Sequence, residues 1–107
     1  MTTKELEAVF EEQVRRCREV LLQKGKEYTP DDADRFSSFK SAAVLQHTTQ
    51  ANALLGMLSK HIVSLFDMGY VGTERYDMAV WDEKITDALN YLFILAAILK
   101  EEKVSKT

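Results

Sequence analysis

The sequence contains few residues that interrupt a helix, with one proline and four glycines among 107 residues. Long segments rich in Ala, Leu, Glu and Lys are typical of helices and do not fit a fold of short strands. The single cysteine, Cys17, excludes an intrachain disulfide and favours a reducing compartment. Because the chain suits one compact core, we expect a single all-α domain over residues 1–107, with a polar tail from about residue 101.

The sequence also lacks a long apolar run and an excess of positive charge. Its longest apolar run, Tyr91–Leu99, has nine residues, whereas a membrane-spanning helix needs about 20. The N-terminal residues do not show the apolar segment of a signal peptide. The net charge is −3, and Lys and Arg are scattered among acidic residues, so duplex nucleic acid is not an expected partner. We expect a cytoplasmic protein with no membrane partner.

Four segments have the apolar spacing of helices. They are Thr3–Lys24, Arg35–Leu45, Thr49–Met68 and Met78–Glu101. The residues predicted to face the core in the first three are Leu6, Phe10, Val14, Cys17 and Leu21; Phe36, Phe39 and Ala43; and Leu54, Leu58, Ile62 and Leu65. Because a short connector follows the third helix, the two long C-terminal helices should form an antiparallel hairpin within a four-helix bundle-like fold.

Capping residues define the predicted ends of these helices. They are Thr3, Gly25, Asp34, Thr48 or Thr49, and Gly69. The loop before the second helix has three aspartates, Asp31, Asp32 and Asp34, but lacks the glycine and the closing glutamate of an EF-hand loop. Capping of the following helix by Asp34 is therefore favoured over binding of a cation.

Two helices carry polar side chains on one side at helical spacing. Glu83, Asp87 and Asn90 lie at i, i+4 and i+7 in the last helix, and Lys60 and Asp67 lie seven residues apart in the third. In a hairpin these side chains should meet in one inward-facing groove. Because carboxylate oxygens are ligands that Mg²⁺ or Mn²⁺ accepts, Asp67, Glu83 and Asp87 are predicted metal ligands. Lys60 and Asn90 are the predicted catalytic residues, placed to contact a phosphate.

A structural explanation of the same residues stays open. Glu83 and Asp87 could complement the positive N-terminal end of their helix, while Lys60 forms a salt bridge with Asp67. The spacing does not distinguish this arrangement from a metal site. His61 is expected in the core, because no second histidine or cysteine stands at metal-ligand spacing.

Two other catalytic arrangements are not favoured. A ferritin-like di-iron site needs Glu-x-x-His pairs, but Leu58 and Val44 stand three residues before His61 and His47. A Ser-His-Asp triad needs a motif that positions the nucleophile, and the sequence shows no such motif.

Four segments between Lys24 and Leu99 carry a resemblance to a known superfamily. They read KGKEY, DADRFSSFK, SKHIVSLFDMG and WDEKITDALNYL. They resemble small phage and prophage helical proteins related to the MazG-like all-α nucleoside triphosphate pyrophosphatases. In that superfamily, carboxylates on two facing helices hold Mg²⁺ for cleavage between the α and β phosphates. Glu83 and Asp87 resemble the first Glu and the Asp of the E-E-x-x-D segment, and Lys84 replaces the second Glu.

The resemblance implies a nucleotide substrate, Mg²⁺ as the cofactor, and a homodimer or tetramer, located in a bacterial host cell if the protein is phage-encoded. The apolar run Tyr91–Leu99 also favours self-association, because one neighbouring face in so small a domain cannot cover it. We therefore expect Mg²⁺-dependent hydrolysis of a nucleoside or deoxynucleoside triphosphate to monophosphate and pyrophosphate. The alternative is a non-enzymatic, phage-derived oligomeric binding or assembly module with the same fold.

Overall fold

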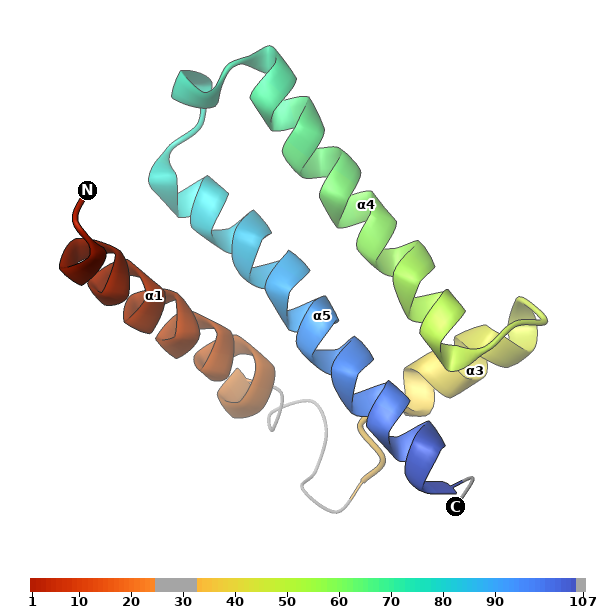
Figure 1. Ribbon diagram of the computed structural model, residues 1–107. Coiled ribbons are helices and arrows are strands. Elements are labelled where there is room, and N and C mark those ends of the chain that lie inside the picture. Colours follow the sequence, from red (N-terminus) through yellow and green to blue (C-terminus); the bar gives the residue numbers. More distant parts are fainter. Residues whose placement is uncertain (25–32, 106–107) are drawn as a thin grey trace. The chain divides into compact units, whose positions relative to one another are not determined.

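The computed structural model describes residues 1–24 and 33–105, and every regular element in these ranges is a helix (Figure 1). The prediction of an all-α protein is confirmed for these residues. The chain divides into two compact units, Met1–Ala33 and Asp34–Thr107. The four-helix bundle and the single domain stay predictions. The expected cap Gly25 and the aspartates Asp31 and Asp32 lie outside the described residues.

The first unit consists of helix α1 (Thr3–Arg18), which continues as the π-helical segment η1 (Glu19–Lys24). The side chain of Thr2 caps α1 by accepting a hydrogen bond from the backbone N–H of Glu5 at 3.1 Å. The prediction of Thr3 as the cap is wrong by one residue. The extended backbone that an N-cap requires occurs at Thr2, whereas Thr3 is already helical.

The predicted apolar face of α1 and η1 is only partly buried. Cys17 is buried, Val14 and Leu21 are half-buried, and Leu6 and Phe10 are exposed. Within the first unit Leu6 and Phe10 are exposed, and their expected place in the core of the whole chain stays a prediction.

An ion-pair network lies on the exposed side of α1. The Glu12 carboxylate accepts hydrogen bonds from Arg15 at 2.6 Å and from Arg16 at 3.3 Å. The hydrogen bonds from Arg15 and then Arg16 lower the pKa of Glu12 to about 2. Because these side chains are solvated, the network adds little to stability and keeps α1 polar on this side.

The second unit contains helices α3 (Ser37–Leu45), α4 (Gln50–Val71) and α5 (Met78–Ser105), with the 3₁₀ turn η2 (Thr73–Arg75) before α5. Helices α4 and α5 lie side by side in opposite directions, and α3 packs against α4 (Figure 1). The antiparallel hairpin expected of the two long C-terminal helices is present. No helix in the described part of the chain is long and apolar enough to cross a membrane.

The core of the second unit lies where its three helices meet. Phe39, Leu54 and Ile98, one from each helix, are buried in a single cluster. The side chains packed around this cluster are Phe36, Met57, Tyr91, Ile94 and Leu95. Complete burial of a side chain as large as Leu54 contributes roughly 1.5–3 kcal/mol. The inward orientation predicted for the aromatic residues of α3 is confirmed.

Helix α4 ends three residues later than the sequence predicted. The backbone of Gly69 continues the helix, which ends after Val71 at Gly72. Gly72 has a φ of 135°, a conformation that favours glycine because it has no Cβ. The end predicted at Gly69 is wrong, since the backbone of Gly69 stays helical and the positive φ occurs at Gly72, directly after α4. The cap at the start of α4 is Thr49, which accepts a hydrogen bond from the N–H of Asn52 at 3.1 Å.

Asp34 closes the turn before α3, and it does not cap the helix directly as predicted. The N–H of Phe36 donates to the Asp34 carboxylate at 2.9 Å, and the N–H of Ser37 donates to its backbone carbonyl at 3.3 Å. The same carboxylate accepts a hydrogen bond from Lys40, whose ammonium lies 3.7 Å from Glu101. The bond from Lys40 lowers the pKa of Asp34 and raises the pKa of Lys40.

Candidate functional site

The pairing of α4 with α5 determines the position of each candidate residue along the common axis of the two helices, here called its height. The rings of His61 and Tyr91 are in contact, with their centroids 4.8 Å apart. Leu54, seven residues before His61, and Ile98, seven residues after Tyr91, belong to the same core cluster. Both pairs therefore indicate one antiparallel register between the two helices.

This register brings the candidate residues to the heights that the sequence predicted. Asp67, six residues after His61, lies at a height between Glu83 and Asp87 along the axis of α5. Lys60 lies about two turns away from Asp67, near the height of Asn90. The end of α4 thus faces the start of α5, as expected of a hairpin.

The observed exposure of these side chains differs from the prediction that all five line an inward-facing groove. Asn90 is buried and Asp87 is half-buried, but Glu83, Lys60 and Asp67 are exposed. The inward orientation predicted for Lys60 and Asp67 is wrong, whereas Glu83 shares the side of α5 that carries Asn90 but is exposed there. The polar side of α5 changes from buried to exposed toward the start of the helix, and the polar pair of α4 lies on its outer surface.

The position of the core on α4 explains this difference. Leu54 and Leu58 are buried, and they lie on the side of α4 that faces α5. Lys60 and Asp67 lie about 100° or more around the helix from that side. The polar spacing correctly placed these two residues on one side of α4, but this side does not face α5.

The candidate carboxylates are not gathered around a common point. Within the described ranges, no three His, Cys, Asp or Glu side chains are placed so that they could hold a metal ion. The structure therefore does not bring Asp67, Glu83 and Asp87 together as a set of Mg²⁺ ligands. Their role as metal ligands stays a prediction.

The purely structural role considered for these residues has two parts: Glu83 and Asp87 would complement the helix dipole, and Lys60 would pair with Asp67. The described residues show neither contact. Helix α5 begins at Met78 and has no acidic residue in its first turn, where the helix dipole acts most strongly. Glu83 and Asp87 lie beyond that turn. The part of the chain that the structure describes also shows no ion pair for Lys60 or Asp67.

Asn90 is the buried polar residue of the candidate site. Its side chain is 6% exposed, and neither Oδ1 nor Nδ2 has a hydrogen-bond partner among residues 1–24 and 33–105. A buried amide left without partners costs about 1–3 kcal/mol. Thr86, four residues earlier in α5, is buried as well. The sequence reasoning missed Thr86, because threonine belongs neither to the apolar nor to the charged pattern.

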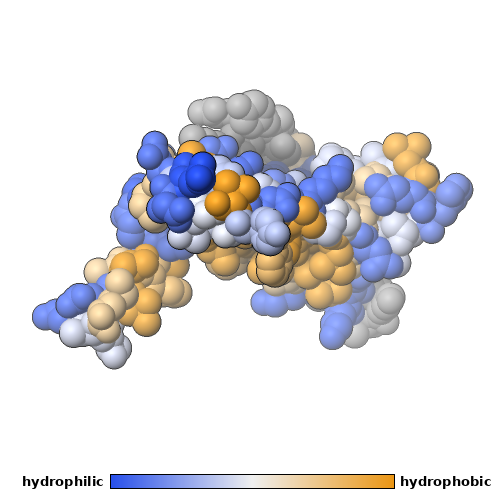
Figure 2. Space-filling model, turned by 90° about the horizontal axis from the view of Figure 1, so that it is seen from above, coloured by the Kyte–Doolittle hydropathy of each residue, from blue (hydrophilic) through white to orange (hydrophobic). Residues whose placement is uncertain are grey.

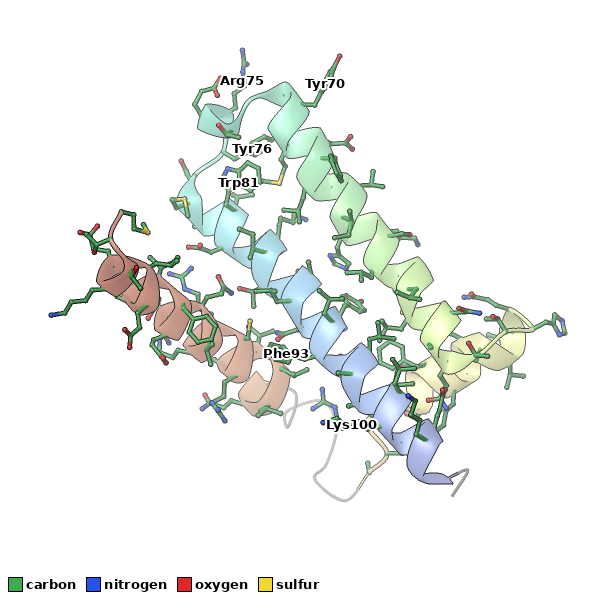
Figure 3. The ribbon with its side chains drawn as sticks, in the orientation of Figure 1. Tyr70, Arg75, Tyr76, Trp81, Phe93 and Lys100 are labelled. Atoms are coloured by element: carbon green, nitrogen blue, oxygen red, sulfur yellow. The ribbon has the colours of Figure 1, made fainter. Side chains whose placement is uncertain are left out.

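Helix α4 also has an apolar side that points away from the core. It consists of Leu55, Ile62, Phe66 and Tyr70, which share one side of the helix and are all exposed. We call this set the outer stripe. Phe66 is 73% and Tyr70 94% exposed, and Tyr70 points away from the helix pair in Figure 3. Figure 2 shows apolar side chains at the surface beside hydrophilic ones.

The outer stripe corrects one predicted core position. Ile62 was expected to face the core, but it is exposed, and His61 contacts α5 in its place. The spacing of i, i+7, i+11 and i+15 from Leu55 to Tyr70 was a signal that could have identified the stripe. It was missed because Ile62 fits both the inner and the outer pattern.

The described part of the second unit carries shallow depressions, of which two lie near the end of α4 and at the connector. One has a volume of about 380 Å³ and adjoins the outer stripe; its lining residues are Leu65, Phe66, Gly69 and Tyr70. The other, of about 460 Å³, lies at the connector and is lined by Thr73, Glu74, Tyr76, Met78, Trp81 and Ile85. Here the indole Nε1 of Trp81 donates to the carbonyl of Thr73 at 3.2 Å, and Tyr76 contacts Trp81 edge-on (Figure 3). The five candidate residues line neither depression.

The chain matches no known protein family, no curated protein and no solved structure. The resemblance to the MazG-like pyrophosphatases stays a prediction that rests on the four sequence segments quoted above.

Proposed function

We propose that the protein is a self-associating helical module, in which copies of the chain bind one another through the outer surface of α4. The observation that carries this proposal is the outer stripe, with Phe66 and Tyr70 largely exposed. Covering apolar surface is favourable because it removes that surface from water. Apolar side chains exposed together on a small unit often belong to an interaction surface. This function corresponds to the oligomeric binding or assembly module that the sequence left as the alternative.

The apolar run of α5 gives further support. Tyr91 and Ile98 face the core, whereas Leu92, Phe93 and Leu99 remain exposed. The second unit therefore exposes apolar side chains from both long helices. Each such side chain, when covered fully, contributes on the order of 1.5–3 kcal/mol relative to its exposed state.

The molar mass in solution tests this function. Sedimentation equilibrium across the micromolar range should give a mass above the 12.2 kDa of one chain. Phe66→Ser should shift the protein toward the monomer, because it removes one of the two aromatic rings of the stripe. Val44→Ser is the matched control, since Val44 is an exposed apolar residue on α3 and lies outside the stripe. A wild-type monomer up to the limit of solubility would contradict the proposal.

Hydrolysis of a nucleoside triphosphate is a second candidate function, and the unpartnered amide of Asn90 supports it. Glu83, Asp87 and Asn90 share one side of α5, and an amide can both donate to a phosphate oxygen and accept from a bound group. A ligand at this position would satisfy the polar atoms that are otherwise buried without partners. Release of pyrophosphate from the common nucleotides, with and without Mg²⁺, tests this activity.

A further inference from the structure

We infer that the depression at the connector between α4 and α5 binds a small organic cation that carries a quaternary ammonium group, such as choline. We call it the connector depression; its volume is about 460 Å³, and its lining residues are Thr73, Glu74, Tyr76, Met78, Trp81 and Ile85. All six belong to the second unit. Sites for small ligands typically have volumes of roughly 300–1,000 Å³. The lining combines two aromatic rings with one carboxylate, and these are the groups that recognise an alkylated ammonium.

The two aromatic rings stand as adjacent walls of the connector depression. The ring centroids of Tyr76 and Trp81 are 6.2 Å apart, and the ring planes are almost perpendicular, at 80° (Figure 3). Both side chains are half-buried, and part of each lines the depression. An aromatic ring attracts a cation over its face within about 6 Å of its centre, because the face carries the negative part of the ring quadrupole. Two perpendicular walls therefore bring both rings within reach of one cation.

A backbone hydrogen bond holds the indole of Trp81 in place. Nε1 of Trp81 donates to the carbonyl of Thr73 at 3.2 Å, which links the first turn of α5 to η2. The indole has no other donor, so it offers no hydrogen bond to an anion or to a neutral acceptor in the depression. A cation needs only the ring itself. The hydrogen bond thus leaves a fixed aromatic surface that favours a cation over an anion.

The carboxylate of Glu74 supplies the negative charge of the site. It lies against Gly72, since a Cβ built on that glycine would be only 2.6 Å from Oε1 of Glu74. The missing side chain of Gly72 therefore leaves the space in which the carboxylate lies. Among the described residues Glu74 has no ion pair, and the neighbouring base, Arg75, points away from Tyr76 and Trp81 in Figure 3. The carboxylate is thus available to a cation from solution.

The chain around the depression also favours a cation. Residues 73–83 include four acidic residues and one basic residue, which gives this segment a net charge of −3. Such a segment raises the local concentration of cations and repels anions. A quaternary ammonium suits the lining better than a primary ammonium, which is strongly hydrated. Its methyl groups have no N–H to leave unsatisfied, and they can contact the rings and the side chain of Met78.

The fluorescence of Trp81 tests this binding directly, because Trp81 is the only tryptophan of the chain. Titration with choline chloride, compared with sodium chloride at equal ionic strength, should change the emission with a dissociation constant on the order of a millimolar. Neohexyl alcohol is the uncharged carbon analogue of choline and has nearly the same shape. It should bind about tenfold more weakly, because it attracts neither the ring faces nor the carboxylate.

Substitutions separate the contribution of the charge from that of the rings. Glu74→Gln keeps the size of the side chain and removes its charge, so it should weaken choline binding by about fivefold. Glu11→Gln removes the same charge from an exposed position on α1; it is the matched control and should leave the affinity unchanged. Tyr76→Leu removes one wall and should also weaken binding by about fivefold, whereas Tyr76→Phe keeps the ring and should retain the affinity.

Several results would overturn the inference, once circular dichroism has confirmed that each variant is folded. One is an emission of the wild type that choline leaves unchanged at concentrations far above a millimolar. Others are equal affinities for choline and neohexyl alcohol, equal effects of Glu74→Gln and Glu11→Gln, or equal losses in Tyr76→Leu and Tyr76→Phe. Much tighter binding of a trimethyl-lysine peptide, or of phosphatidylcholine vesicles, would reject a free small cation as the occupant and assign the depression to a protein or a membrane partner.

Discussion

The ring of His61 on α4 packs against the ring of Tyr91 on α5 at a centroid distance of 4.8 Å and an interplanar angle of 39°. The distance lies in the range that favours ring pairs, which contribute about 0.5–1.5 kcal/mol beyond the area they bury. His61 is half-buried and therefore has a packing role where α4 meets α5. The contact also maintains the helix register that sets Asp67 at a height between Glu83 and Asp87.

Adjacent leucines on α4 should give opposite results when each is shortened. Leu54 is 0% exposed, so Leu54→Ala should lower the free energy of unfolding by about 2–5 kcal/mol through lost contacts and a cavity. Leu55 is 44% exposed, so Leu55→Ala should change it by less than about 0.5 kcal/mol. Urea denaturation measures both values. Equal losses at the two positions would show that the inner and outer sides of α4 are wrongly assigned.

The C-terminal end of α4 should tolerate no side chain at Gly72. A Cβ there would lie 2.6 Å from the Oε1 atom of Glu74, and the φ of 135° is strained for any L side chain. Gly72→Ala should therefore lower the free energy of unfolding by about 1–3 kcal/mol. Gly56→Ala is the control, because Gly56 lies inside α4 with no atom within 4 Å of its Cβ position. It should stabilise the fold by roughly 0.5–1 kcal/mol; destabilisation at both positions would contradict the strain assigned to Gly72.

The Asp34–Lys40 pair should make a small, pH-dependent contribution to stability. The pKa of Asp34 is lowered from 3.8 in the folded state, so its contribution is present above pH 3.8 and disappears as the pH falls through the lowered pKa. The pKa of Lys40 is raised from 10.5, so its contribution is present below pH 10.5 and disappears as the pH rises through the raised pKa. Asp34→Asn should therefore be less stable than wild type at neutral pH and equal to it in strong acid.

A double-mutant cycle isolates this pair from other acid effects. Lys40→Met should cause a similar loss at neutral pH, and the combined variant should lose less than the sum of the two single losses. Thermal unfolding from acid to neutral pH gives the differences. A loss in Asp34→Asn that persists unchanged below the lowered pKa would assign it to the turn before α3 and not to the charge of the pair.

The sequence predicted the helices and their pairing because these follow from local patterns. The spacing of apolar residues located α3, α4 and α5, and the short connector required α4 and α5 to run in opposite directions. Helix ends were less certain because two glycines, Gly69 and Gly72, stand close together. Only the backbone shows which of them adopts positive φ.

The candidate site was harder to predict because it depends on the rotation of each helix. Polar spacing shows that Lys60 and Asp67 share one side of α4, but it does not show which side meets α5. The inner and outer sides of α4 both carry leucines, and Ile62 fits either pattern. The choice between them depends on tertiary contacts such as that of His61 with Tyr91, which a single helix does not encode.

Substitutions on the polar side of α5 should separate catalysis from a structural role. If the protein hydrolyses nucleotides, wild type releases pyrophosphate in the presence of Mg²⁺, and Asp87→Asn lowers the rate by orders of magnitude. The same change should leave the free energy of unfolding unchanged or raise it, because it removes the repulsion between Asp87 and Glu83 at i, i+4. A structural role of Asp87 predicts the reverse, with lower stability and no effect on any rate.

Asn90→Leu extends this test to the buried amide. The change replaces two unpartnered polar atoms with an apolar side chain of similar size, so it should raise the free energy of unfolding by about 1–2 kcal/mol. If the amide contacts a nucleotide, the same variant also loses pyrophosphate release. Thermal unfolding with and without Mg²⁺, together with pyrophosphate release from the common nucleoside and deoxynucleoside triphosphates, measures both effects. A wild-type protein that shows neither turnover nor stabilisation by Mg²⁺ would exclude hydrolysis and retain self-association as the function of the hairpin.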